Sequence, residues 1–196
     1  MRSDPTILAF DTSAAHCAAA LLQNGVIIAS CVEPMSRGQA ERLMPLLEEL
    51  LEENGCNWRD LDAIGVGVGP GNFTGIRISV SAARGLALGL DVPAVGVSGF
   101  DALAELAPKG DLPAIPAPRD QVYLMPDGAK ARLVARHEAE SLGRLYLCDQ
   151  PDRQVRTIAR LASRRLASTL TPPAPLYVRP ADAAPSRDVP PVLLDE

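Results

Sequence analysis

The alternation of apolar and polar segments predicts a sheet at the start of the chain. Apolar stretches at residues 6–10, 17–22 and 26–32 predict three strands. Asn24-Gly25 separates the second stretch from the third, and both residues tolerate the positive φ of a type I′ turn. We therefore expect the second and third strands to form an antiparallel hairpin.

A helical period replaces the strand pattern at residues 36–54, where leucines recur every three or four positions and glutamates occupy most of the other face. Pro45 removes a backbone hydrogen bond, so the regular helix starts near Arg42 or is kinked there. The next predicted elements are a strand at 63–68, a helix at 75–90, a strand at 92–97 and a short helix at 101–107. This order is typical of an α/β layer with a mixed sheet.

Beyond Pro108 the pattern weakens, because three prolines interrupt residues 112–118. Residues 121–125 and 145–148 are candidate strands, and residues 152–170 predict a basic amphipathic helix. From Thr171 onward, seven prolines in 26 residues predict an extended, loosely held tail.

Composition narrows the classes of function. The net charge of −5 makes the chain a poor direct ligand for phosphate backbones, so we expect any nucleic acid to be held by another subunit. None of the four cysteines forms a C-x-x-C pair, which argues against zinc and thioredoxin-like sites. We expect a soluble cytoplasmic protein, since no secretory signal follows Met1 and no apolar run reaches the ~18 residues of a membrane span.

The sequence GPGNFTGIR at residues 69–77 joins a predicted strand to a predicted helix, as phosphate-binding loops do. It lacks the Gly-Lys pair of a P-loop, and Pro70 has no N–H to offer an anion. Two interpretations stay open. The loop is a tight turn that packs strand against helix, or Arg77 in the first helical turn meets an anion.

Asp11-Thr12-Ser13 ends the first predicted strand, where phosphotransferases built on paired hairpins place a carboxylate near magnesium. Asp11 and Thr12 are thus weak nucleotide-site candidates, and a local turn stabilised by these side chains is the alternative. His16 and His137 lie far apart in sequence and form no H-x-x-x-H pair, and we expect His16 to be exposed. The sequence offers no complete catalytic constellation and no metal site.

Five segments resemble the TsaB (YeaZ) family over about residues 6–107, and the GPGxFTGxRI segment is highly specific. They are ILAFDTS (7–13), RLMPLL (42–47), GPGNFTGIRI (69–78), ARGLALG (83–89) and PAVGVS (93–98). In the tail, PLYVR at residues 175–179 resembles the P-x-Y-x-R ending of the family.

The resemblance implies an α/β actin-like ATPase (ASKHA) fold of two lobes with mixed sheets, the second reduced. The expected division is a first lobe at 1–107, a second lobe at 108–170 and a proline-rich tail at 171–196. It also implies a non-catalytic subunit, without a cofactor of its own, that pairs with a TsaD-type paralogue and a TsaE-type ATPase. Those partners would carry metal and ATP or ADP and would threonylcarbamoylate the tRNA adenosine next to the anticodon, so the chain would meet tRNA only indirectly.

Both predicted helices of the first lobe carry more apolar positions than one core-facing stripe requires, which indicates a partner surface or simple core packing. The resemblance favours pairing, with TsaD or as a homodimer. The expected interface residues are Gln39, Leu43, Leu46, Leu47, Leu50, Ile76, Ser79, Val80 and Ala83. The expected structural-loop residues are Gly69, Pro70, Gly71, Phe73, Thr74, Gly75 and Arg77. Ala83→Glu is expected to abolish partner binding without unfolding the chain.

Departures from the family pattern are Gln39 in place of histidine, Asn72 in place of serine, and prolines at 116 and 118 where the family has Asp-Ala-Arg. These changes leave two rival functions open. One is an active phosphotransferase of the same fold that uses Asp11 and the glycine loop. The other is a peptidase, as the family's older glycoprotease-like and peptidase M22-like names suggest.

Overall fold

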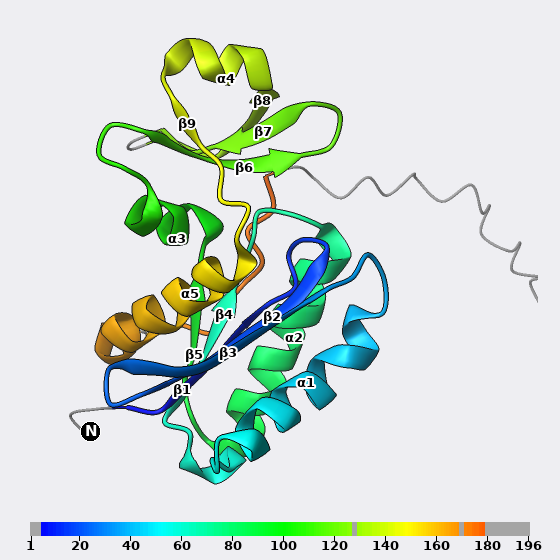
Figure 1. The fold of residues 1–196 in the computed structure, drawn as a ribbon, viewed down its shortest axis with the longest axis vertical. Helices are drawn as coiled ribbons and strands as arrows, with labels where there is room; N and C mark the ends of the chain where they lie inside the picture. The colour runs from blue at the N-terminus through cyan, green and yellow to red at the C-terminus, as the bar shows by residue number, and fades with distance from the viewer. Residues whose placement is uncertain (1–4, 127–128, 169–170, 179–196) are drawn as a thin grey trace, which may run out of the picture.

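Two lobes of unequal size make up residues 5–126, 129–168 and 171–178, the part of the chain that the computed structural model describes (Figure 1). The larger lobe is built on a five-stranded sheet in the order β3-β2-β1-β4-β5. Its strands are β1 (Ile7–Asp11), β2 (His16–Gln23), β3 (Val26–Pro34), β4 (Ala63–Gly67) and β5 (Ala94–Val97). β1, β2 and β3 are antiparallel neighbours, whereas β4 and β5 run parallel to β1, so the sheet is mixed as predicted.

The hairpin between β2 and β3 turns at Asn24 (φ 51°) and Gly25 (φ 74°). These positive φ angles are those that a type I′ turn requires, and they confirm the predicted hairpin. β3 is half-exposed, whereas β1, β2 and β4 are buried almost throughout. β3 lies at one edge of the sheet, and β5 lies at the other.

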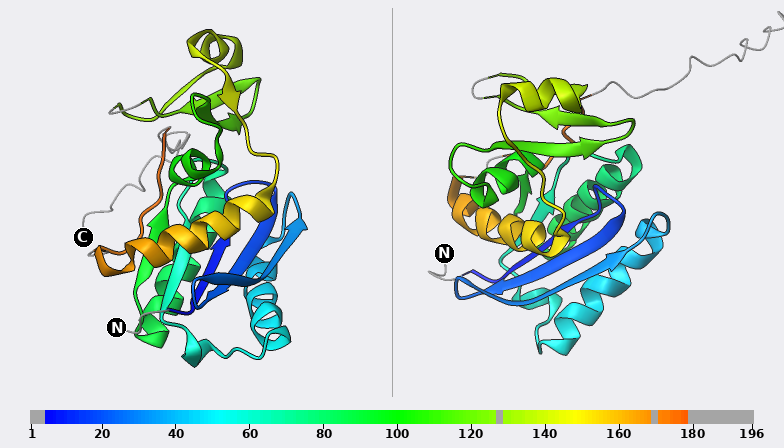
Figure 2. Two further views of the ribbon diagram at one scale, coloured as in Figure 1. Left: turned by 60° about the vertical axis from the view of Figure 1, so that its left-hand side comes forward. Right: turned by 45° about the horizontal axis from the view of Figure 1, so that its top comes forward.

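Helices cover both faces of this sheet (Figure 2). α1 (Gln39–Glu53) and α2 (Phe73–Leu90) pack on one face, and α5 (Pro151–Arg165) crosses the other. Along β1, Leu8 and Phe10 point into the first core, whereas Ile7 and Ala9 point into the second. Because a strand presents alternate side chains to opposite faces, a strand buried on both faces must be apolar without interruption.

α1 begins at Gln39 and continues through Pro45, so of the two alternatives for this helix the start near Arg42 is wrong. Pro45 and Glu41 are both exposed. Water can therefore reach the carbonyl oxygen of Glu41, which loses its helical N–H partner to the proline. A short 3-10 helix, η1 (Trp58–Asp60), follows α1, and α3 (Gly99–Leu106) follows β5.

The smaller lobe is a four-stranded sheet in the order β8-β7-β6-β9, covered by one short helix. Its elements are β6 (Leu112–Ala117), β7 (Gln121–Leu124), β8 (Arg132–Ala135), α4 (Arg136–Leu142) and β9 (Leu145–Tyr146). β8 and α4 were not predicted from the sequence. Among the described residues its buried core contains five, namely Ala114, Val122, Leu124, Val134 and Ala139.

The prolines within residues 112–117 do not interrupt β6, contrary to expectation. β9 pairs with β6 only at Leu112 and Pro113. Pro116 pairs with Val122 of β7 on one side and lies beyond β9 on the other. A proline is tolerated at such an edge because no neighbouring strand needs its missing N–H.

The expected second lobe at 108–170 needs correction, because α5 packs on β1, β2 and β4 of the first lobe. The smaller lobe is thus inserted between α3 and α5. Residues 171–178, expected to be loosely held, also return to the larger lobe, where the Leu176 N–H donates to the Val68 carbonyl (2.8 Å). The rest of the expected tail, 179–196, lies outside the described residues. No helix in the described ranges is both long and apolar enough to cross a bilayer.

Candidate functional site

The glycine loop, defined here as residues 69–75, joins β4 to α2 and passes very close to the backbone at the end of β1. A Cβ atom on Gly71 would lie 2.2 Å from the Ser13 carbonyl oxygen, and one on Gly75 would lie 1.9 Å from that of Thr12. The Asn72 N–H donates to the Ser13 carbonyl (2.6 Å). Only glycine permits this close approach at positions 71 and 75. The backbone N–H of Asn72 is bonded to the Ser13 carbonyl and is therefore not free to bind an anion.

The start of α2 is held in place by local side chains. The Asn72 side chain accepts from the Gly75 N–H (2.9 Å), which caps the helix. Thr74 is exposed, and Pro70 is buried. Gly69 has φ +92°, and a Cβ there would lie 2.5 Å from Cδ1 of Ile76. Asparagine thus serves as the N-cap at the position where the family often has serine.

An aromatic cluster ties the described C-terminal segment to this helix start. The guanidinium carbon of Arg77 lies 4.0 Å from the centre of the Phe73 ring, and the Arg77 Nε–H donates to the Tyr177 hydroxyl (2.9 Å). The rings of Phe73 and Tyr177 have their centroids 4.8 Å apart. Arg77 therefore has a cation–π contact and a hydrogen bond inside the protein, although its side chain is exposed.

The Asp11 side chain is buried and satisfied by its own neighbours. Its Oδ2 accepts from the Ser13 hydroxyl (2.9 Å) and backbone N–H (3.3 Å) and lies 2.9 Å from Nε2 of His16. Its Oδ1 packs against Gly67, where a Cβ would lie only 2.1 Å away. His16 is itself buried, which corrects the expectation of an exposed histidine. The local turn that the sequence offered as an alternative is present, since Ser13 bonds to Asp11. The contact between Asp11 and His16 was not predicted from the sequence.

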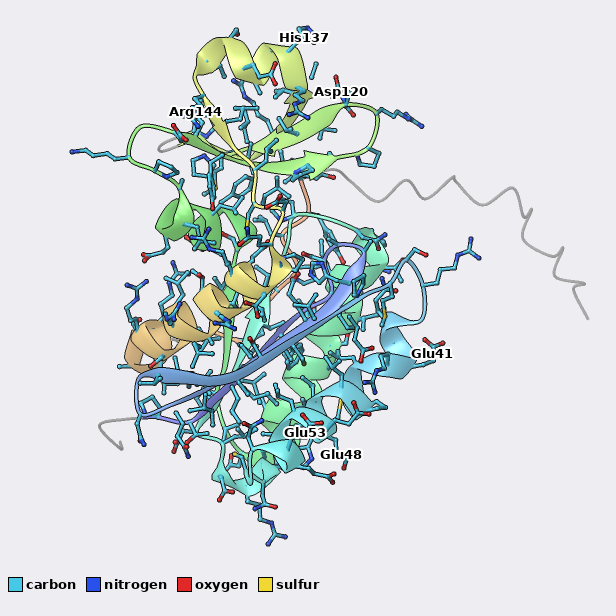
Figure 3. The ribbon with its side chains drawn as sticks, viewed as in Figure 1. Glu41, Glu48, Glu53, Asp120, His137 and Arg144 are labelled. Carbon is cyan, nitrogen blue, oxygen red and sulfur yellow. The ribbon has the colours of Figure 1, made fainter. Side chains whose placement is uncertain are left out.

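Thr12 is fully buried, and its hydroxyl donates to the Gly75 carbonyl (2.7 Å). Asp11 and Thr12, the two nucleotide-site candidates, are therefore both bonded to protein groups. No cluster of three or more metal-ligating side chains occurs among the described residues. Figure 3 places His137 on α4, at the end of the small lobe far from the sheet that carries His16.

A cavity of about 1030 Å³ lies between the lobes and is lined by parts of both. The glycine loop and the Asp11 turn contribute Asn72, Ser13 and His16, while β7 of the smaller lobe contributes Tyr123 and α5 contributes Gln154. Arg77 is the one permanent cation among the described residues that line it. The cavity therefore offers little positive charge for a triphosphate.

The predicted interface residues on α1 and α2 lie inside the protein, with one exception. Those buried against the sheet are Leu43, Leu46, Leu47, Leu50, Ile76, Ser79, Val80 and Ala83. They form the core-facing stripes of the two helices, so the assignment of these eight side chains to a partner surface is corrected. Gln39 is half-buried at the start of α1, where its amide donates to the Met35 carbonyl and its side chain lines the interlobe cavity.

The outer sides of the same helices differ in character. α1 carries glutamates, and Figure 3 shows Glu41, Glu48 and Glu53 pointing outward along it. α2 carries mostly small and apolar residues there, together with the exposed side chains of Arg77 and Arg84. Leu88 is 86 % exposed, and a Cβ on Gly85 would meet nothing within 4 Å. We call the exposed positions Met44, Thr74, Ser81, Gly85, Leu88 and Gly89 the α1–α2 outer face.

Arg42 anchors α1 to the edge strand. Its guanidinium binds Glu33 of β3 (2.6 Å) and also Glu49, two turns farther along the same side of α1. These hydrogen bonds from Arg42 hold the pKa values of both carboxyl groups below their usual range. The network ties α1 to β3 and so fixes the orientation of the helix.

Sequence reasoning overlooked Tyr177 and Leu176 as partners of the glycine loop. The sequence PLYV resembles the family ending, but its contact with α2 was not predicted. Arg77 and Tyr177 are a hundred residues apart, and a contact over that separation leaves no local sequence pattern. The proline-rich surroundings of PLYV indicated a loose tail instead.

The sequence matches known proteins over much of its length. Residues 32–175 match the family described as TsaD, tRNA N6-adenosine threonylcarbamoyltransferase. The chain is 37 % identical over 122 residues to the Escherichia coli "tRNA threonylcarbamoyladenosine biosynthesis protein TsaB", a match that covers 60 % of this chain and 52 % of that protein. The Bacillus subtilis TsaB is 38 % identical over 121 residues, covering 60 % and 53 %. The chain thus spans about half the length of the curated relatives it matches.

A solved structure supports the same assignment. A Pseudomonas aeruginosa protein described as uncharacterized, with similarity to peptidase YeaZ, superimposes with a TM-score of 0.68 and 27 % identity. The match covers 89 % of this chain and all of that one. The predicted two-lobed, actin-like α/β fold is confirmed by this similarity together with the two mixed sheets. The chain therefore belongs to the TsaD family, as a member of its TsaB (YeaZ) branch.

Proposed function

We propose that this chain is a non-catalytic subunit that pairs with a TsaD-type transferase in the threonylcarbamoylation of the tRNA adenosine next to the anticodon. The observation that carries the proposal is the α1–α2 outer face, which combines an exposed leucine, a half-exposed methionine and two exposed glycines on neighbouring helices. Small residues let another helix approach closely, and Leu88 and Met44 supply apolar area for the contact.

The interior of the proposed subunit also favours a supporting role. The Asp11 carboxylate is closed in by Ser13, His16 and Gly67, and the threonine beside it bonds to the start of α2. A group that is engaged in this way stabilises the junction of β1, the glycine loop and α2. We therefore assign these residues to holding α2 in position and the chemistry to the partner, which would carry the metal and the nucleotide together with a TsaE-type ATPase.

The test is reconstitution of the tRNA modification. TsaD-type and TsaE-type proteins are incubated with tRNA and threonylcarbamoyl-adenylate, with and without this chain, and the chain is also incubated alone. We expect product only when this chain accompanies the TsaD-type protein. Gly85→Glu should remove the stimulation, whereas Arg59→Gln, away from both helices, should keep it. Product from the chain alone, or equal product without it, would refute the proposal.

A second function, phosphotransfer by this chain itself, is favoured by the interlobe cavity, because Ser13 and His16, the partners of Asp11, line it. It requires Asp11 to exchange its bonds to Ser13 and His16 for magnesium, and it predicts magnesium-dependent ATP binding by the isolated chain. Calorimetric titration of the chain with ATP and magnesium separates the two functions, since a non-catalytic subunit should give no saturable heat. The homodimer is the alternative partner for the α1–α2 outer face, and sedimentation of wild type against Gly85→Glu tests it.

A further inference from the structure

The solvent side of α5 is a continuous row of arginines. Four of them, Arg153, Arg156, Arg160 and Arg164, are spaced three or four positions apart and therefore lie along one side of the helix. We call these four residues the α5 arginine face. The opposite side of α5 packs into the second core of the larger lobe.

Two of these arginine side chains have no partner among the described residues. The side chains of Arg153 and Arg160 are exposed and make no hydrogen bond or ion pair within the described residues. Arg156 pairs with Asp152 (2.9 Å), and Arg164 pairs with Glu105 (2.9 Å). Both pairs are about half-exposed, and such surface pairs are weak enough to yield to a competing anion.

The charge of the chain is distributed unevenly. Five arginines and a single acidic residue lie on α5, in a chain whose net charge is −5. The exposed side of α1, on the other face of the sheet, carries a row of glutamates instead (Figures 2 and 3). A polyanion is thus repelled from the α1 side and attracted to the α5 side, which stays free when a protein occupies the α1–α2 outer face.

We propose that the α5 arginine face binds the phosphate backbone of RNA. Arg153 and Arg164 lie roughly 16 Å apart along the helix, a length that reaches several phosphate groups. Guanidinium groups bind phosphate oxygens in a bidentate manner. The face carries no large apolar side chain among its arginines. A protein partner would need a desolvated apolar centre, and an anionic membrane would need an apolar side to insert, so both fit less well.

This inference rests on the proposed function for the identity of the RNA, a tRNA, and it replaces the expectation that the chain meets tRNA only indirectly. Because the contact is to the backbone, it is independent of sequence and depends strongly on salt. It gives this subunit a direct part in holding the substrate while its other side holds the transferase.

The test measures binding of the full chain to a fluorescently labelled, unmodified tRNA transcript by anisotropy between 50 and 200 mM NaCl. Four phosphate contacts predict a slope of log K against log salt near −3, which is about a 60-fold loss of affinity over this range. Arg153→Gln/Arg160→Gln should halve the slope and leave about an 8-fold loss. Arg37→Gln/Arg59→Gln, which removes the same charge from exposed positions elsewhere, is the matched control and should behave like wild type.

Equal affinity and slope for wild type and the α5 double variant would overturn the proposal, and so would an equal loss in the matched control. Circular dichroism of each variant establishes that the fold is kept, which exposed glutamines should not disturb. No partner subunit is present in this measurement. A chain that binds tRNA through α5 but fails to stimulate a TsaD-type transferase would refute the proposed function and leave this inference standing.

Discussion

Positions 83 and 85 of α2 separate the core of the larger lobe from its proposed partner surface. Ala83 is fully buried in the first core, in the same cluster as Val80 and Ile76. Gly85 is exposed, with open space where its Cβ would stand. Ala83→Glu should therefore unfold the chain, which corrects the expectation from sequence that it spares the fold. Gly85→Glu should keep the fold and abolish partner binding.

The magnitudes follow from the two environments. A glutamate at position 83 overpacks the core, at about 1–3 kcal/mol, and buries a charge without a partner, at about 3–5 kcal/mol. The sum of roughly 4–8 kcal/mol is as large as the whole stability of many domains. At position 85 the change from glycine to glutamate raises helix propensity and should stabilise the chain by up to about 0.8 kcal/mol. In the complex the same side chain would fill the space that a facing helix needs.

Urea unfolding followed by far-UV circular dichroism measures the two free energies of unfolding, and calorimetric titration with a TsaD-type protein measures binding. A folded Ala83→Glu variant with near wild-type stability would refute the burial of Ala83. A Gly85→Glu variant that binds the TsaD-type protein as tightly as wild type would refute the placement of the partner on the α1–α2 outer face. Gly85→Ala, which adds only a methyl group, is the matched control and should keep binding within a few-fold.

Three further outcomes follow from the described contacts. Gly67→Ala should lower the free energy of unfolding in urea by at least about 2 kcal/mol, because its Cβ displaces the buried Asp11 carboxylate; an unchanged midpoint would contradict the packing. Burial raises the pKa of Asp101, but hydrogen bonds from Arg165 and Ser98 outweigh it and hold the pKa below its ordinary 3.8. The stability from this half-exposed pair, under about 1 kcal/mol, is therefore present above pH 3.8 and lost as pH falls through the lower folded value. Asp101→Asn should remove that part of the acid limb in pH-dependent thermal melts, and an unchanged limb would contradict it. Burial also raises the pKa of the Cys17 thiol to about 11, so iodoacetamide at pH 8 should modify it only after unfolding, as mass spectrometry of the peptides can follow. Rapid labelling in the native protein would contradict its burial.

Much of the larger lobe could be predicted from sequence, because its signals are local. The Asn24-Gly25 turn, the buried strands and the helical periods each depend on residues close together in the chain. The small lobe was harder to predict. β8 and α4 are short, and the prolines of β6 are tolerated only because β9 pairs with so little of it.

The candidate site shows the limit of periodicity as a guide to surfaces. The pattern identified Leu43 and Ala83 as parts of apolar stripes but could not say whether a stripe faces a sheet or a partner. The exposed Leu88 lies outside the stripe and was not predicted as an interface residue. The bond between His16 and Asp11 joins neighbours in sequence, yet it depends on the turn that brings the imidazole back over the strand end.

The late position of α5 in the chain affects how the protein is made. A ribosome releases β1 to β5 first, then the whole small lobe, and only afterwards the helix that covers one face of the larger sheet. At a synthesis rate of 5–20 residues per second, α5 emerges on the order of 3–10 s after β5, and the sheet face stays uncovered during that time. Much of it consists of alanines, among them Ala9, Ala18 and Ala20. A nascent chain with an alanine-rich face exposes less apolar area than one with a leucine-rich face. It should therefore bind other proteins and chaperones less strongly.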